Sequence, residues 1–225
     1  MRKMKTCIVM PAYNEEKVIG KVIDGLKKEG YSEIIVVDDG SADSTSAVAR
    51  KRGAKVYRHP LNRGLGGALG TGIAAAREYA DVIVTFDSDG QHDPKEIAKL
   101  IRPIEKGRAD VVIGSRMKNP KGMPFIRRVG NTGFNIITYI LFGVWTTDSQ
   151  SGFRAFSKKA ANTIEIHTNR MEVSSEIIRE IGRKSLKFVE VPITPIYTEY
   201  SIRHGQSHLN GFRILAKLIL KKLMR

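Results

Sequence analysis

The composition of the 225-residue chain excludes several broad classes of protein. With 41% hydrophobic and 27% charged residues, it has the balance of a globular domain and not that of a disordered segment. The excess of 38 Lys and Arg over 23 Asp and Glu gives a formal charge of +15, which predicts a polyanionic partner: nucleic acid, an anionic membrane surface or a phosphorylated substrate. One cysteine, Cys7, excludes a disulfide framework and favours a reducing, cytoplasmic setting.

Residues 6–113 alternate short β-branched runs with helical patterns. These predict strands at 6–10, 33–37, 54–57, 82–86 and 110–113, and helices at 16–28, 43–52, 66–79 and 94–106. The alternation predicts an α/β fold with a mostly parallel, Rossmann-like central sheet and helices on both faces. Ligands of such sheets bind beyond the carboxyl ends of the strands, and here those ends are followed by polar and acidic residues.

The chain beyond residue 116 predicts a different organisation. We expect a loop at 118–124, helices at 125–145 and 172–183, a strand at 187–191 and a basic loop at 197–208. Residues 209–225 predict an amphipathic helix that could lie on a membrane, with one basic stripe made of Arg213, Lys217, Lys221 and Arg225.

Hydropathy predicts no membrane span. The apolar run at the N-terminus breaks at Pro11, which is too early for a signal peptide or anchor. No segment reaches the roughly 20 apolar residues that cross a bilayer. The nearest, at 136–145, is expected to form a core helix or an interfacial helix.

The segment Asp87-Ser88-Asp89-Gly90-Gln91 predicts a metal site. Extended residues alternate sides, so residues 87, 89 and 91 would present two carboxylates and an amide oxygen to one point. An all-oxygen set of this kind suits Mg²⁺ or Mn²⁺. Asp, Ser and Gly also favour solvated turns, but the position at a strand end favours the metal site.

Two other strand ends predict a nucleotide site. Asp39 follows the second strand and could accept hydrogen bonds from a nucleobase or a ribose, while Ser41 or Asp43 could cap the next helix. Tyr13 and Glu15 follow the first strand, where the ring could pack on a base and the carboxylate could bind a ribose hydroxyl.

The glycine-rich segment 62–70 does not predict a dinucleotide site. The sixth position from Gly64 is Leu69 instead of Gly or Ala, and a long loop precedes the segment. We expect a helix start whose backbone can closely approach a ligand or a neighbouring strand.

Arginines in loops or at element ends could bind phosphate bidentately, and each could equally be a solvated surface charge: Arg116, Arg127, Arg128, Arg154 and Arg203. The histidines have no metal-ligand spacing. His59 and His167 are expected to be structural or surface residues, and His92 either tunes the metal site or belongs to a simple loop.

Together these motifs resemble the family 2 glycosyltransferases of the GT-A fold, and within them the dolichyl-phosphate mannose and glucose synthases. The resemblance runs from Ile8 to about Ser207 and is specific only in combination. It rests on Pro-Ala-Tyr-Asn-Glu-Glu at 11–16, Val-Val-Asp-Asp-Gly-Ser at 36–41, Asn-x-Gly-Leu-Gly at 62–66, Asp-x-Asp-Gly-Gln-His at 87–92, Gly-Ser-Arg at 114–116 and Ser-Gly-Phe-Arg at 151–154.

The resemblance implies a role for each matching residue. The donor nucleotide sugar would contact Pro11, Tyr13, Glu15, Asp39, Asp87, Ser88, Asp89, Arg116, Arg203 and His208. The metal, Mg²⁺ or Mn²⁺, would be held by Asp87, Asp89 and Gln91, and the acceptor phosphate by Arg128 and Arg154. Catalysis would involve Asp89, Arg116, Arg154 and, if a carboxylate base is used, Glu176 or Asp148.

The resemblance also implies one GT-A domain over residues 1–225. Residues 1–116 would form the nucleotide and metal half, 117–208 the acceptor half, and 209–225 the amphipathic helix. The family's late basic loop commonly ends in Gly-x-Ser-Lys, whereas this chain has His208 in place of the lysine, so GDP-mannose, UDP-glucose and UDP-N-acetylglucosamine are all open as donors.

The implied reaction is an inverting transfer of the sugar to a polyprenyl phosphate such as dolichyl phosphate, by an enzyme on the cytoplasmic face of the membrane. A family 2 enzyme with a saccharide or protein acceptor is the alternative. A sugar-nucleotide pyrophosphorylase lacks support because its basic, glycine-rich N-terminal loop is missing. Nucleic-acid binding would leave the acidic strand ends unexplained, because carboxylates repel a phosphate backbone. The sequence leaves the oligomeric state open.

Overall fold

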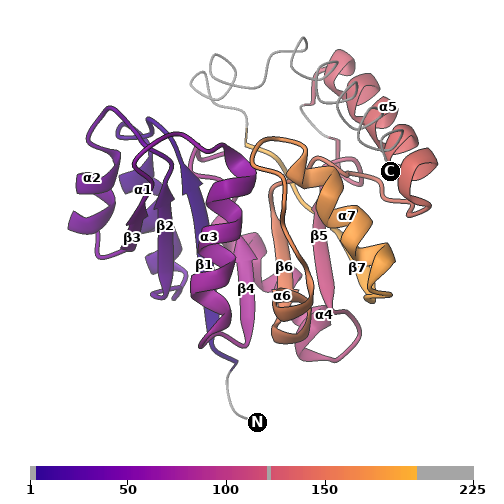
Figure 1. The fold of residues 1–225 in the computed structure, drawn as a ribbon, viewed down its shortest axis with the longest axis horizontal. Helices are drawn as coiled ribbons and strands as arrows, with labels where there is room; N and C mark the ends of the chain where they lie inside the picture. The colour runs from indigo at the N-terminus through magenta and orange to yellow at the C-terminus, as the bar shows by residue number, and fades with distance from the viewer. Residues whose placement is uncertain (1–3, 121–122, 197–225) are drawn as a thin grey trace.

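The computed structural model describes residues 4–120 and 123–196, in which seven strands form one sheet (Figure 1). The strands are β1 (Thr6–Ala12), β2 (Ile34–Asp38), β3 (Lys55–Arg58), β4 (Val82–Thr85), β5 (Val111–Ser115), β6 (Arg154–Ser157) and β7 (Phe188–Pro192). Their order across the sheet is β3-β2-β1-β4-β6-β5-β7. All neighbouring pairs are parallel except those made by β6, which runs antiparallel between β4 and β5. The predicted mostly parallel sheet is confirmed.

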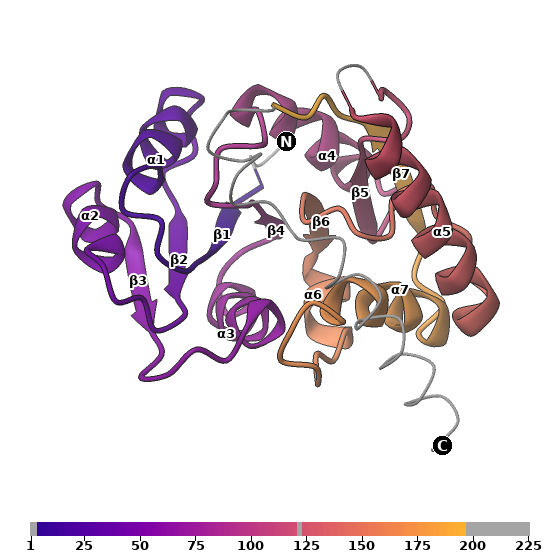
Figure 2. The same cartoon turned by 90° about the horizontal axis from the view of Figure 1, so that it is seen from above.

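Helices cover both faces of the sheet, as predicted (Figure 2). They are α1 (Ile19–Lys28), α2 (Thr45–Lys51), α3 (Leu65–Arg77), α4 (Ile97–Glu105), α5 (Phe125–Phe142), α6 (Lys158–Thr163) and α7 (Val173–Arg183), with a 3-10 turn at Pro94–Glu96 before α4. Because side chains alternate along a strand, Ile8 and Met10 pack into the core beneath α1 and α4, whereas Cys7 and Val9 pack into the core beneath α3, α6 and α7.

Two features differ from the sequence prediction. The strand β6 and the short helix α6 were not expected, since Arg-Ala-Phe-Ser is too short and too polar at its start to predict a strand; its pairing with β4 and β5 makes it one. The helix α5 ends at Phe142, three residues earlier than 145, because Gly143 adopts a left-handed conformation with φ of 70° and donates its N–H to the carbonyl of Tyr139 (2.7 Å).

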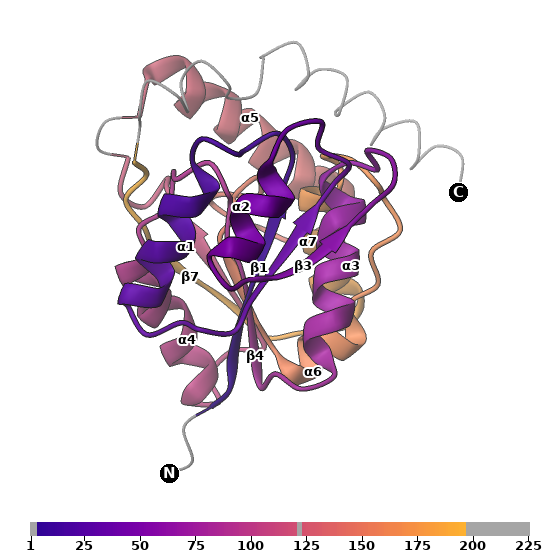
Figure 3. The same cartoon turned by 90° about the vertical axis from the view of Figure 1, so that its left-hand side faces the viewer.

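The strand register brings the polar loops to one edge of the sheet. Ala12 at the end of β1 lies opposite Asp38, and Val9 lies opposite Thr85. Arg154 pairs with both Thr85 and Ile113, so the loops after β1, β2, β4 and β5 gather at the same edge. Beyond this edge lies α5, at the end of the molecule opposite the start of β1 (Figure 3, seen from the β3 edge).

Part of the predicted organisation lies outside the described residues. This applies to the whole basic loop at 197–208, with Arg203 and His208, and to the amphipathic helix at 209–225. Within 4–120 and 123–196, no helix is both long and apolar enough to cross a membrane.

Candidate active site

The acidic pair lies directly beyond β4. Asp87 accepts a hydrogen bond from Nε2 of His92 (2.8 Å), and 34% of its side chain is exposed. Asp89 accepts from the backbone N–H of Gln91 (2.9 Å) at one oxygen and from the side-chain amide of Gln91 (2.6 Å) at the other. Gly90 allows this turn because it adopts a positive φ of 78°. The three predicted metal ligands therefore lie in one short loop.

The two carboxylates have different electrostatic surroundings. Burial raises the pKa of Asp87, but His92, Arg116 and Arg154 favour its charged form more strongly and hold the pKa below its ordinary value. Burial and the neighbouring charge of Asp87 raise the pKa of Asp89. A divalent cation would relieve the repulsion within this pair. No group of three His, Cys, Asp or Glu side chains suited to a metal occurs among the described residues, so a cation here would need further ligands from substrate or water.

His92 and Gly152 fix the orientation of Asp87. The His92 ring is buried against Phe86 and Phe153, with centroid distances of 5.5 and 4.8 Å. A Cβ atom added to Gly152 would lie 2.5 and 2.6 Å from the two carboxylate oxygens of Asp87, so only glycine leaves room for them. Of the two roles open to His92, the geometry therefore supports the one beside the metal site. The position of Gly152 next to Asp87 was not predicted, because the two residues are far apart in the sequence.

The loops after β1 and β2 bind each other. Asn14 donates its N–H to Oγ of Ser41 (2.9 Å), and Glu16 donates its N–H to Asp43 (3.1 Å). Asp43 also accepts from the N–H of Thr45 (3.0 Å), the first residue of α2, so the expected capping of this helix by Asp43 is confirmed, whereas the Ser41 hydroxyl accepts from Asn14 instead. Both side chains thus join the two loops. Tyr13 remains half exposed at the rim that the loops form.

Asp39 is a buried anchor for the loop before α3. Its carboxylate accepts from Nδ1 of His59 (2.7 Å) and from the N–H groups of Arg63 (2.9 Å) and Gly64 (2.6 Å). The other ring nitrogen of His59 lies 2.9 Å from Oγ1 of Thr71, which confirms a structural role for this histidine. Three of the hydrogen-bonding positions of Asp39 are thus already taken by protein, and its contact with a nucleoside stays a prediction.

The glycine-rich segment is where another loop packs. A Cβ on Gly66 would overlap the carbonyl of Thr168, and the N–H of Gly67 donates to the carbonyl of Asn169 (3.0 Å). Close approach of the backbone at these glycines is confirmed, but the neighbour is a loop instead of the expected strand or ligand. Glu176 holds the packed loop, since its buried carboxylate accepts from the N–H groups of His167 (3.1 Å) and Thr168 (2.8 Å). These hydrogen bonds show that Glu176 anchors the loop. Its role as a base stays a prediction.

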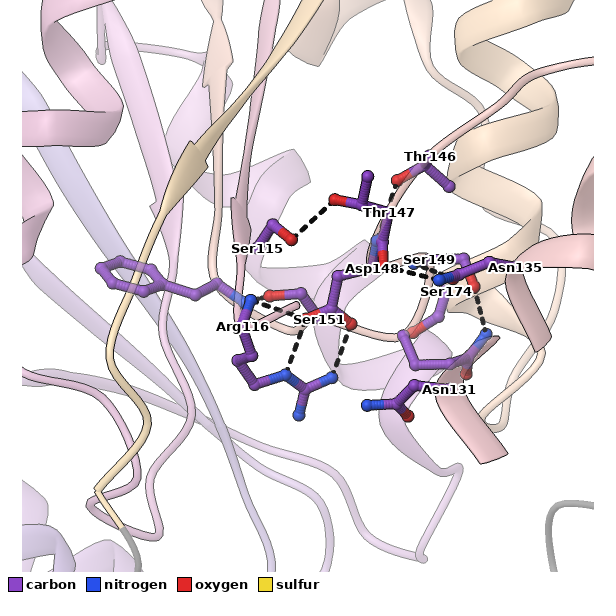
Figure 4. Close-up of polar contacts among 12 residues, drawn as sticks. Ser115, Arg116, Asn131, Asn135, Thr146, Thr147, Asp148, Ser149, Ser151 and Ser174 are labelled. Carbon is purple, nitrogen blue, oxygen red and sulfur yellow. Dashed lines mark hydrogen bonds and ion pairs between the residues drawn. The ribbon is translucent and has the colours of Figure 1, made fainter. Parts of the chain in front are cut away.

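Arg116 is held in a defined orientation by Asp148 (Figure 4). Nε of Arg116 donates to one carboxylate oxygen of Asp148 and a terminal nitrogen donates to the other, both at 2.8 Å. The backbone N–H of Arg116 adds a third hydrogen bond (2.9 Å). The Asp148 side chain is fully buried, whereas 20% of the Arg116 side chain is exposed. Asp148 therefore presents Arg116 at the sheet edge.

The loop that carries Asp148 is itself fixed from two sides. From α5, buried Asn135 donates to the carbonyl of Thr147 (2.5 Å) and accepts from the N–H of Ser149 (2.9 Å) (Figure 4). From β7, Glu190 accepts from the N–H of Thr147 (2.8 Å) and from its hydroxyl (3.0 Å). Neither Asn135 nor Glu190 is predictable from the sequence, since nothing in the local sequence links them to residue 148.

The remaining predicted arginines lie in different places. Arg154 is buried, donates to the carbonyl of Ser149 (2.9 Å), and has no hydrogen-bond partner for its Nε among the described residues. Burial lowers the pKa of Arg154 to about 10, against the opposing effect of Asp148 and Asp87. Arg128 is exposed on α5. The assignment of Arg128 and Arg154 to an acceptor phosphate stays a prediction.

Comparisons with known proteins identify the family. The model of the family described as Glycosyl transferase family 2 matches residues 7–165. A UDP-N-acetylglucosamine–dolichyl-phosphate N-acetylglucosaminyltransferase of Methanococcus voltae is 42% identical over 239 residues, covering 96% of this chain and 95% of the relative. A dolichol-phosphate mannosyltransferase of Pyrococcus furiosus is 34% identical over 229 residues, and the match covers 96% of this chain but 62% of that protein.

A solved structure supports the fold. Glucosyl-3-phosphoglycerate synthase from Mycobacterium tuberculosis, in complex with Mn²⁺, UDP and phosphoglyceric acid, superposes with a TM-score of 0.75 at 22% identity, over 98% of this chain and 78% of that one. At this identity the similarity establishes the architecture alone. With the family match and the identity to full-length relatives, it establishes that the chain belongs to glycosyltransferase family 2 and has the GT-A fold.

Proposed function

We propose that the protein transfers a hexose or an N-acetylhexosamine from a nucleoside diphosphate sugar to dolichyl phosphate or another polyprenyl phosphate. The observation that carries the proposal is the meeting of an acidic pair, Asp87 and Asp89, with the oriented guanidinium of Arg116 at one sheet edge. Carboxylates that can hold a cation, next to an arginine aimed by a buried partner, suit a donor with a negatively charged diphosphate.

The residues present fit a divalent cation. Asp87, Asp89 and the amide oxygen of Gln91 would hold it, since all three belong to one loop and offer the oxygen ligands that Mg²⁺ and Mn²⁺ prefer. When bound, such a cation supplies stabilisation of the negative charge on the departing nucleoside diphosphate. Arg116 would stabilise the same charge from the protein side.

The acceptor needs little activation. A phosphate monoester is largely a dianion near neutral pH because its second pKa is about 6. It can therefore displace the diphosphate at the anomeric carbon directly, with inversion. Asp148 and Glu176, the two candidate bases, already serve as acceptors for Arg116 and for the loop at 167–168, so a base role is not needed for either.

Phosphate binding by Arg154 is supported by an unpaired donor in its guanidinium. Nε of this buried guanidinium lacks a partner among the described residues, although buried polar atoms are normally hydrogen-bonded. An anionic oxygen of the substrate would satisfy it. Arg128 would contribute from α5, and Tyr13, Glu15 and Asp39 from the nucleoside side.

Among the donors, UDP-N-acetylglucosamine is the first to test. Its support is the 42% identity to the Methanococcus voltae enzyme over nearly the whole of both chains, whereas the mannosyltransferase relative is 34% identical. A lipid acceptor places the proposed reaction at a membrane. The charge of +15 favours its anionic cytoplasmic leaflet, where we propose peripheral attachment.

The test is transfer of radiolabelled sugar from UDP-N-acetylglucosamine, UDP-glucose and GDP-mannose into an organic-extractable product that depends on polyprenyl phosphate. The reaction is run with Mg²⁺, with Mn²⁺ and with a chelator, and Asp89→Ala serves as the inactive control. We expect one donor to label the lipid, with the label lost in the chelator and in the variant. Labelling of saccharide or protein but not of lipid would contradict the proposed acceptor.

A further inference from the structure

The helix α5 has two faces of opposite character. Its inner face contributes Asn135, which is 4% exposed and binds the loop that carries Asp148. At about 3.6 residues per turn, its exposed large hydrophobic side chains fall within one half of the helix circumference, from the flank beside Asn135 to the side opposite it. These apolar and aromatic side chains are between 45% and 79% exposed: Phe125, Ile126, Val129, Ile136, Tyr139 and Ile140. Exposed Arg128 and Thr132 lie on the same helix.

The apolar face continues past the end of the helix. Trp145 is 54% exposed and packs edge-to-face on Tyr139, with ring centroids 5.7 Å apart at 83°. We call the six exposed α5 side chains and Trp145 the α5 face. Contiguous exposed apolar surface of this kind marks an interaction site on a globular protein, and tryptophan and tyrosine favour the boundary between water and lipid.

Charge indicates the partner. The sequence from 111 to 147 contains no Asp or Glu, and its five basic residues are Arg116, Lys118, Lys121, Arg127 and Arg128. Two of these lie in the first turn of α5, next to Phe125 and Ile126. An apolar helix face with cations at its border and no acidic residue is complementary to the anionic headgroups and acyl chains of a bilayer.

We infer that the α5 face is the surface on which the protein docks to an anionic lipid bilayer. The inference rests on the proposed lipid acceptor and adds the orientation of the enzyme. Because the inner face of α5 holds the Thr147–Ser149 loop, and through Asp148 also Arg116, docking by the outer face brings the candidate site to headgroup depth. A membrane-bound phosphate is then within reach without leaving the bilayer.

Trp145 allows a direct test because it is the only tryptophan in the sequence. Vesicles of phosphatidylcholine with phosphatidylglycerol are added to the full-length protein at low and high salt. We expect the emission of Trp145 to shift to the blue and to be quenched by brominated lipid. Both effects should weaken in high salt and with pure phosphatidylcholine, since part of the attraction is electrostatic.

Variants test the face itself. Ile126→Ser combined with Ile140→Ser removes two outward side chains and should lower the vesicle partition coefficient by about tenfold or more. Leu61→Ser is the matched control: its side chain is 76% exposed but lies between β3 and α3, at the opposite edge of the sheet from β7. The double variant should keep its transfer rate to a short, water-soluble polyprenyl phosphate and lose rate only with acceptor embedded in vesicles.

Three results would overturn the inference. Vesicle binding without any change in Trp145 emission would place the membrane contact on another face. Resistance of Trp145 to iodide quenching before vesicles are added would show that the face is covered by the rest of the chain or by a second copy. Equal partition coefficients for the double variant and the Leu61→Ser control would show that the apolar side chains of the α5 face do not contribute to vesicle binding. Failure of transfer to the soluble acceptor as well would instead count against the proposed function.

Discussion

Asp148 holds Arg116 by two parallel hydrogen bonds of 2.8 Å and accepts a third from its backbone. The aspartate is fully buried and the arginine is partly exposed, so the pair presents a cation at the sheet edge while hiding the group that aims it. A planar guanidinium is suited to this role because both of its donors match the carboxylate geometry, whereas a lysine offers one flexible point charge.

Removal of the Asp148 charge should impair both catalysis and the stability of the fold. Asp148→Asn loses one acceptor for Arg116, and we expect kcat to fall by about 100-fold as the arginine loses its orientation. The free energy of unfolding should fall by about 1–3 kcal/mol, because a buried acceptor is changed. Kinetics and urea unfolding measure the two effects. Asp24→Asn, which breaks the exposed ion pair with Arg52, is the control and should change neither; an equal loss of activity there would contradict the positioning role.

His92 should govern metal affinity through its hydrogen bond to Asp87. His92→Leu keeps an apolar side chain between Phe86 and Phe153 but removes the donor, and we expect Mn²⁺ affinity to fall by about 10- to 100-fold. His92→Gln can place an N–H near the same point and should recover part of that loss. Electron paramagnetic resonance of free Mn²⁺, titrated with protein and UDP, measures the affinity without turnover. Equal binding by all three proteins would show that His92 only fills space.

Gly152→Ala should displace Asp87. The new methyl group would lie 2.5 Å from one carboxylate oxygen and 2.6 Å from the other, so the side chain must rotate and lose its bond from His92. We expect a loss of Mn²⁺ affinity comparable to that of His92→Leu in the same titration. Gly130→Ala in α5 is the control, since its Cβ meets nothing within 4 Å, and it should raise the free energy of unfolding by about 0.5–1 kcal/mol with metal binding unchanged.

Because of Cys7, the free energy of unfolding should decrease as the pH becomes alkaline. Burial raises the pKa of its thiol in the folded protein, despite the opposing hydrogen bond from Tyr79. The stabilising contribution of the neutral thiol is therefore complete below about pH 8.5, the pKa of a cysteine thiol in the unfolded chain. It is lost as the pH rises above that value. Urea unfolding at pH 7 and pH 9.5 should show a larger loss for the wild type than for Cys7→Ala. A thiol reagent should label Cys7 at the rate of unfolding, and fast labelling of the folded protein would contradict its burial.

The sequence was sufficient to predict a feature wherever the residues that form it lie within one strand, helix or loop. The strand at 82–86 followed by Asp87 and Asp89, and the strand at 33–37 followed by Asp38 and Asp39, could be predicted because β-branched runs and strand-end polar residues are local features. The glycine-rich start of α3 was also predictable as a place of close approach, although the loop at 168–169 that packs there was not.

Contacts between distant residues could not be predicted from one sequence. The bond between Asp148 and Arg116 spans 32 positions and that between Glu190 and Thr147 spans 43, and no residue spacing links either pair. The strand β6 exists because β4 and β5 offer it two partners, not because its own four residues favour extension.

By itself, the sequence determined the alternation of strands and helices, the edge at which polar loops collect, and the chemistry of the residues there, because backbone preference and hydrophobic periodicity act over a few residues. The tertiary structure alone decided which buried partner orients Asp87 and Arg116, and which side of α5 faces outward. Those features depend on side chains that meet only after the sheet has formed, since packing and buried hydrogen bonds join residues far apart in the chain.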